Sequence, residues 1–150
     1  MTNKNKFLAL ALFAAITVCA FAQDESQAGE TTVKGRLLKA SYAGRDTTSL
    51  YEPIVTIRQS ETLGVSYLTF ELEGARSARN SKTYEFYNDG SANSPLIWKR
   101  RMRGVVVDPI TVYIATTPGA TDSTNNLLIS YEYTDSKGFG TVSYVVSLEK

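Results

Sequence analysis

The sequence predicts an all-β protein: an antiparallel β-sandwich of about eight strands that follows an N-terminal signal peptide. Three observations lead to this fold class. Apolar and polar residues alternate with a period of two along several short segments, and turn-forming residues separate these segments at short, regular intervals. No segment after residue 22 has the period of a helix.

The alternation is clearest in residues 126–150. A polar stretch at 135–138, which ends in glycine, separates two runs in which every second residue is apolar. A period of two on both sides of such a connection is typical of a β-hairpin with one buried face. The apolar sets are Leu127, Ile129, Tyr131 and Tyr133 in the first run and Val142, Tyr144, Val146 and Leu148 in the second.

The rest of the chain repeats this pattern. Pro53 suits the first position of a strand, where no backbone donor is required, and residues 88–90 have the Asn-Asp-Gly composition of a turn. Lysine and arginine in the first segment favour an edge position, because they discourage pairing between sheets of different molecules. The further strands are expected at 31–42, 54–59, 65–73, 82–87, 96–103 and 110–116.

The first 22 residues have the three parts of a secretory signal. Lys4 and Lys6 make a basic start, residues 7–18 carry no charge, and Ala20 and Ala22 offer the small residues that a signal peptidase reads. Cleavage is therefore expected before Gln23. The predicted organisation is a signal peptide at 1–22, a flexible polar leader at 23–30 and one β-sandwich domain at 31–150.

Two alternatives for the N-terminus stay open. An uncleaved membrane anchor would need about 20 apolar residues, and the uncharged run is shorter than that. Lipidation at Cys19 would normally want a small residue in front of it, where the sequence has Val18. We therefore expect an exported protein in the periplasm, at the cell surface or outside the cell, with no transmembrane span in the mature chain.

The net charge and the cysteine content limit the expected partners and the expected cellular compartment. Lys4 and Lys6 are two of the 16 basic residues, so the chain after the signal has 14 basic residues against 15 acidic ones. A nearly neutral chain gives no general field for nucleic acid, and no nucleic-acid partner is expected. Cys19 is the one cysteine, so the mature protein reaches an oxidising compartment without disulfides, which favours the bacterial envelope.

Missing residue types exclude several kinds of catalysis. The chain has no histidine, and Cys19 lies in the signal, so Ser-His-Asp and Cys-His catalysis are excluded and zinc, copper and haem lose their usual ligands. A carboxylate hydrolase is a minor hypothesis, since Glu71 and Glu73 lie two apart on one strand. We expect no cofactor, no metal and no catalytic residue.

A basic stretch at 98–103 is the first candidate binding site. If it is a strand, Lys99, Arg101 and Arg103 line one face, and Arg100 lies between Trp98 and Met102 on the other face. Three cations beside an indole could hold an anionic polymer or an acidic partner surface. The same run is also typical of a solvated edge strand, in which case Arg100 needs a carboxylate partner or a bulge that redirects it.

Tyrosines give the second candidate binding site. The alternation places Tyr67, Tyr87 and Tyr113 on outward faces. Exposed aromatic rings can contact sugars or form the centre of a protein interface. Tyrosine is also common at half-buried sheet positions without any binding role.

These observations predict a non-catalytic module for binding or assembly in the bacterial envelope or at the cell surface. Its partner would be another envelope or surface protein, a second copy of the chain, or a polysaccharide, and a free sheet edge would offer one route to docking. The first alternative is a carbohydrate-binding β-sandwich that uses the outward tyrosines and Trp98. A further alternative is a small outer-membrane β-barrel, although the basic run at 99–103 cannot supply its outward apolar band.

Overall fold

The computed structural model describes residues 29–100 and 109–150, and these residues fold into antiparallel strands. The all-β antiparallel prediction is confirmed. The predicted signal peptide at 1–22, leader residues 23–28, and Arg101 and Arg103 lie outside the described residues. The strands are β1 (Glu30–Tyr42), β2 (Arg45–Asp46), β3 (Ile54–Thr62), β4 (Val65–Leu72), β5 (Lys82–Asn88), β6 (Ile97–Arg100), β7 (Ile110–Pro118), β8 (Thr124–Asp135) and β9 (Gly138–Glu149).

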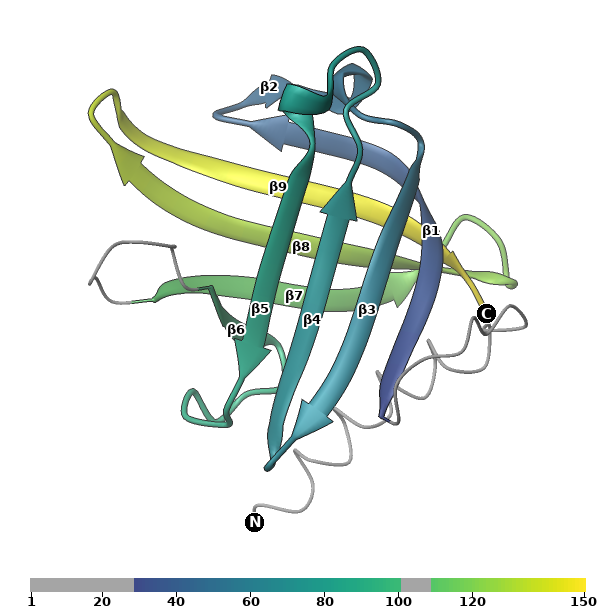
Figure 1. Cartoon of the computed structure of the whole chain (residues 1–150), viewed down its shortest axis with the longest axis vertical. Helices are drawn as coiled ribbons and strands as arrows, with labels where there is room; N and C mark the ends of the chain where they lie inside the picture. Colours follow the sequence, from purple (N-terminus) through teal and green to yellow (C-terminus); the bar gives the residue numbers. More distant parts are fainter. Residues whose placement is uncertain (1–28, 101–108) are drawn as a thin grey trace.

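Successive strands pair with one another, and the sheet closes on itself. The order β1-β3-β4-β5-β6-β7-β8-β9 is completed by pairing between β9 and β1. The two-residue β2 pairs with the last two residues of β1. Strands β3, β4 and β5 form one layer, and β7, β8 and β9 form a second layer that runs across it (Figure 1). The result is a closed, barrel-like sheet of two crossing layers.

Strand β1 forms one corner between the layers. Its first half, from Glu30 to Arg36, pairs with β3, and its second half, from Arg36 to Tyr42, pairs with β9. The register shifts between Leu37 and Lys39, as expected of a bulge that bends a strand. β1 is therefore more than an edge strand, because its two halves have partners on different sides, although residues 30–35 pair with β3 alone.

Gly35 allows the tight approach at this corner. A Cβ at this position would lie 2.5 Å from Val146 Cγ1 and 2.8 Å from Leu148 Cδ2, and both side chains are buried. Replacing Gly35 with alanine is expected to lower the free energy of unfolding by about 1–3 kcal/mol, because the core must shift to admit the methyl group. Urea unfolding followed by circular dichroism measures this change.

Lys39, an exposed residue of the same strand, provides the control. Replacing it with alanine should change stability by less than about 0.5 kcal/mol. A Gly35→Ala protein as stable as the Lys39→Ala protein would show that Gly35 is not packed closely against Val146 and Leu148 of β9.

The second corner between the layers, at β6, has less backbone pairing than the corner at β1. Only Phe86 and Tyr87 of β5 pair with β6, opposite Arg100 and Lys99, whereas four residue pairs join β6 to β7. Along residues 82–85, no strand in the described part of the chain pairs with β5 on the side away from β4. Sheet closure thus leaves a short stretch of free edge there.

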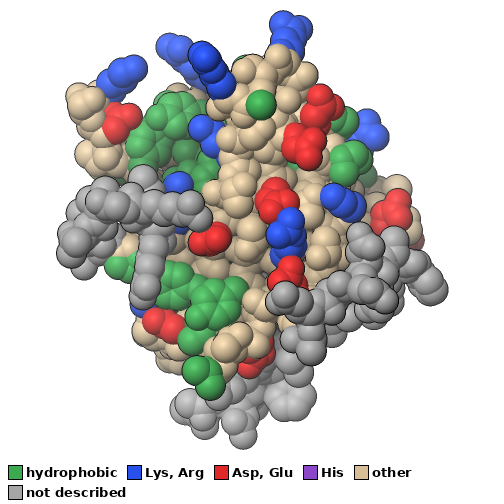
Figure 2. Space-filling view, viewed as in Figure 1, with side chains coloured by type: hydrophobic (Ala, Val, Ile, Leu, Met, Phe, Trp, Pro, Cys, Tyr) green, Lys and Arg blue, Asp and Glu red, His purple; other side chains and the backbone are tan. Residues whose placement is uncertain are grey.

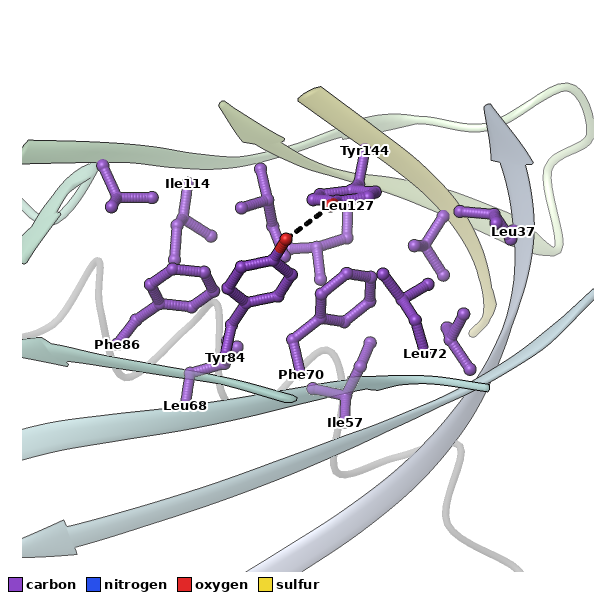
Figure 3. Close-up of a cluster of buried hydrophobic side chains, with 14 of the residues drawn as sticks. Leu37, Ile57, Leu68, Phe70, Leu72, Tyr84, Phe86, Ile114, Leu127 and Tyr144 are labelled. Atoms are coloured by element: carbon purple, nitrogen blue, oxygen red, sulfur yellow. Dashed lines mark hydrogen bonds between the residues drawn. The ribbon is translucent and has the colours of Figure 1, made fainter. Parts of the chain in front are cut away.

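The core lies between the two layers and is built from the inward residues of nearly every strand. Aromatic rings occupy its centre: Phe70 packs against Tyr84 and Tyr144, whose hydroxyls hydrogen-bond at 2.7 Å (Figure 3). The alternation predicted for 126–150 is confirmed, since Leu127, Ile129, Tyr131, Val142, Tyr144, Val146 and Leu148 are all buried. The largest side chains in the core with almost no exposure are Trp98, Phe70, Phe86, Ile57, Leu68 and Leu72.

Candidate functional site

A cavity of about 970 Å³ lies at the end of the sheet where β1 and β8 finish and β7 and β9 begin. Its volume falls in the range of small-molecule sites in proteins, about 300–1,000 Å³. On the viewed face, apolar side chains gather beside the tip of the β8–β9 hairpin (Figure 2). The cavity is lined by Tyr42, Arg100, Ile110, Thr111, Tyr113, Ser130, Tyr131, Glu132, Tyr133, Thr134, Asp135, Phe139, Thr141 and Val142.

Two stacked tyrosines form one wall of this cavity. The rings of Tyr42 and Tyr133 lie 5.1 Å apart, centre to centre, with an angle of 25° between their planes. Gly140 pairs with Tyr133 across the hairpin, and a Cβ at Gly140 would lie 2.5 Å from Tyr133 Oη. The missing side chain at this position thus lets the Tyr133 ring lie across β9 and reach the end of β1.

The Tyr133 hydroxyl of this wall stays neutral near neutral pH. The neighbouring Tyr42 hydroxyl, together with some loss of solvent, raises the pKa of Tyr133 to about 12. The Tyr133 hydroxyl can therefore donate and accept hydrogen bonds, while both rings present apolar faces. Such a wall suits a flat apolar molecule that carries polar groups.

Arg100 lies on the inner wall, partly buried. Its Nη1 donates a hydrogen bond to Tyr131 Oη at 3.1 Å, and its guanidinium carbon lies 4.6 Å from the Tyr84 ring centre and 5.3 Å from the Tyr131 ring centre. Aromatic faces attract a cation at these distances. The sequence required a carboxylate partner or a bulge for this residue, and the structure instead places two tyrosine rings around it.

Burial also keeps the phenol of Tyr131, which contacts Arg100, in its neutral form. Loss of solvent raises the pKa of the Tyr131 phenol, Tyr84 adds to this effect, and the positive charge of Arg100 opposes it. Tyr131 is therefore a neutral hydroxyl that accepts from Arg100. The inner end of the cavity thus combines one fixed positive charge with neutral aromatic walls.

The outward candidate residues form a stripe across four neighbouring strands. Tyr67 of β4 pairs with Tyr87 of β5, and Tyr87 pairs with Lys99 of β6. Lys99 Nζ lies 3.3 Å from Asp89 Oδ2 and also contacts the Ser91 hydroxyl. Tyr113 follows on β7 beside Ile97, so the stripe brings together four of the residues that the sequence singled out.

Trp98 is placed differently from its predicted role. Its side chain is 1% exposed, and its indole N–H donates to the carbonyl of Pro95 at 3.1 Å. An enclosed indole has no free face for a ligand at the surface. Trp98 therefore contributes to the core, and Lys99 faces outward without it.

Tyr113 is the one predicted residue that lines the cavity in the described part of the chain. Sequence reasoning missed Tyr42, Arg100, Tyr133 and Phe139 as site residues. Arg100 did leave a signal, since a cation between two residues that favour burial was already anomalous. The other three gave no signal, because strand alternation cannot show which strand ends meet.

Glu71, a candidate for carboxylate chemistry, has a structural partner. Glu71 forms an ion pair with Arg58 at 2.9 Å on the outward face. Residues 29–100 and 109–150 contain no cluster of three or more acidic residues arranged to hold a metal ion. Within the same ranges, no helix has the length and apolar character needed to cross a membrane.

Fold and cavity together define a closed antiparallel β domain with an aromatic, cation-containing cavity at one end. No family model matches the sequence, and comparisons with curated proteins and with solved structures likewise find no match.

Proposed function

We propose that this chain is an exported, non-catalytic binding protein whose ligand enters the cavity beside Tyr42 and Tyr133. The observation that carries the proposal is the cavity itself, about 970 Å³ in volume and lined by four tyrosines and one phenylalanine. An open hollow of this size, lined by aromatic rings with a few polar groups, has the character of a small-molecule site.

The chemistry of the cavity supports binding rather than catalysis. Its two acidic residues, Glu132 and Asp135, are exposed, and the Asp135 carboxylate accepts a hydrogen bond from the Lys137 amide. The chain has no histidine, the most common general acid or base. The cavity thus offers aromatic surface, hydroxyls and a cation, which suit recognition.

Sheet closure favours a cavity ligand over docking along an edge. A strand of a partner can add only where backbone groups are free, and the stretches paired on one side only are short, at residues 30–35, 82–85, 132–135 and 138–141 of the described strands. Lys82 and Glu85 are exposed in the stretch 82–85, and such charges discourage pairing with another sheet. Assembly through an envelope partner or a second copy would need another surface.

Export is supported by the basic start, the uncharged run and the small residues of the first 22 positions. Sequencing the N-terminus of the protein recovered from the periplasm or medium tests this part of the proposal. A first residue of Gln23 is expected. Recovery of the intact chain in the cytoplasm would overturn it.

A neutral aromatic probe tests the cavity. N-phenyl-1-naphthylamine should bind with a large rise in fluorescence, and replacing Tyr42 with alanine should weaken binding about fivefold to tenfold because the stacked wall is lost. The matched control is Tyr67→Ala. The two tyrosines are similarly exposed, at 47% and 42%, but Tyr67 lies on the outward stripe.

The two variants separate the outcomes. Binding that weakens with Tyr42→Ala and not with Tyr67→Ala supports the cavity. No probe binding, or equal effects of the two changes, would overturn the proposal.

A carbohydrate-binding role is the second candidate, and the outward stripe of Tyr67, Tyr87, Lys99 and Tyr113 favours it. Aromatic rings on neighbouring strands can contact successive sugar rings, and Lys99 could contact an acidic group. A glycan array with the wild-type protein and Tyr67→Ala tests this role. Glycan signals that disappear with Tyr67→Ala would support it, and an array without signals would remove it.

A further inference from the structure

We propose that the cavity selects an anionic apolar ligand, and that Arg100 binds its carboxylate, sulfonate or phosphate group. This inference rests on the proposed function, since it names the chemistry of the ligand in the same cavity. The ligand would place a flat or chain-like apolar body along the aromatic walls and its charged group against the inner end.

Arg100 carries a positive charge that is only partly satisfied by its described neighbours. A guanidinium has five N–H donors and stays protonated in proteins. In the described part of the chain, its side chain makes one hydrogen bond, to the neutral Tyr131 hydroxyl, and takes part in neither ion pair. Buried or partly buried cations are normally paired with an anion, so an acidic ligand group would complete this site.

Two tyrosine rings hold Arg100 in position at the cavity. Tyr84 and Tyr131 hold the guanidinium from the core side, at 4.6 and 5.3 Å from their ring centres. Its backbone register opposite Phe86 and Ile110 fixes the strand that carries it. A cation held in this way is already in place before an anion binds, so little ordering is needed on binding.

Two acidic residues of the cavity would act on an anionic ligand. Glu132 and Asp135 also line it, but both are exposed, and water and salt weaken their effect on an anion at the inner wall. Glu132 follows Tyr131 on β8 and therefore belongs to the opposite face of the strand, so it borders the cavity from the outward side and not from the side of Arg100. The walls near Arg100 are apolar and include Ile110 and Val142.

A matched pair of probes tests the inference on the wild-type protein. 8-Anilinonaphthalene-1-sulfonate has the same two aromatic groups as N-phenyl-1-naphthylamine and adds one negative charge. A charge-assisted hydrogen bond to Arg100 should make the sulfonate bind about tenfold more tightly. Fluorescence titration of both probes at a fixed salt concentration gives the ratio.

Arg100→Met should remove this preference, raising the dissociation constant of the sulfonate about tenfold while the neutral probe changes little. Lys99→Met is the matched control, because it removes the same charge one residue away on the outward face. Its binding ratio should equal that of the wild type. Thermal unfolding of each variant establishes that it is folded.

The outcomes keep the two proposals apart. Equal affinity of the two probes for the wild type would overturn the anionic ligand and leave the cavity proposal standing. Loss of preference with Lys99→Met rather than Arg100→Met would also overturn it. Failure of both probes to bind would overturn the proposed function itself.

Discussion

Replacing Trp98 with alanine is expected to lower the free energy of unfolding by about 3–5 kcal/mol, a large part of the stability of a typical domain. Trp98 is the largest side chain in the core with almost no exposure, and truncation would leave a large cavity. The Pro95 carbonyl would also lose its indole donor. Strand β6 would be weakened most, because only two residue pairs join it to β5.

Urea unfolding followed by far-ultraviolet circular dichroism measures the effect, since the variant has lost the one tryptophan of the chain. Trp98→Phe keeps an aromatic ring in the core and should cost less than half as much. Tyr113→Ala, at an exposed position of the neighbouring strand, should stay within about 1 kcal/mol of the wild type. A Trp98→Ala protein of wild-type stability would instead agree with a surface role for the indole.

Alkaline conditions are expected to unfold the protein steeply. Burial raises the pKa of Tyr131 and Tyr144 in the folded state, whereas a tyrosine in the unfolded chain titrates near 10. The stability that comes from these neutral phenols is complete below about pH 10 and is lost as the pH rises above it. Each of the two contributes about 1.4 kcal/mol per pH unit once the unfolded chain is ionised.

Between pH 10.5 and 11.5, the free energy of unfolding should therefore fall by at least about 2.5 kcal/mol, because Tyr51 and Tyr133, whose pKa values are also raised in the folded state, add to the loss. Urea unfolding at a series of pH values measures this slope. Tyr144→Phe removes one of the titrating groups, so its slope should be shallower than that of the wild type by about 1.2 kcal/mol per pH unit even though its starting stability differs. A wild-type slope near zero, or equal slopes in the two proteins, would contradict the neutral tyrosine core.

Much of the strand pattern could be predicted because a strand places alternate residues on opposite faces. This rule identified the buried faces of β8 and β9 and placed Tyr67, Tyr87 and Tyr113 outward. It also placed Trp98 and Arg100 on one face of β6. It could not tell which face of β6 is inside, because an indole suits either a core or a binding surface.

The candidate site could not be found in the same way. Tyr42, Arg100 and Tyr133 lie at the ends of β1, β6 and β8, which are far apart along the chain. Nothing in local alternation shows that β1 leaves β3 after Arg36 and pairs with β9. That change of partner brings Tyr42 to Tyr133 and creates the aromatic wall.

The sequence by itself determined that this protein is built from antiparallel strands, which side chains share a face, and that the chain has no histidine and a single cysteine. Only the tertiary structure decided that the sheet closes through β1 and β9, that Trp98 is enclosed and that Arg100 lies at a cavity. The physical reason is the separation of the interacting residues along the chain. The period of a strand is set by neighbouring residues, whereas sheet closure and cavities depend on contacts between strands that are distant in the chain.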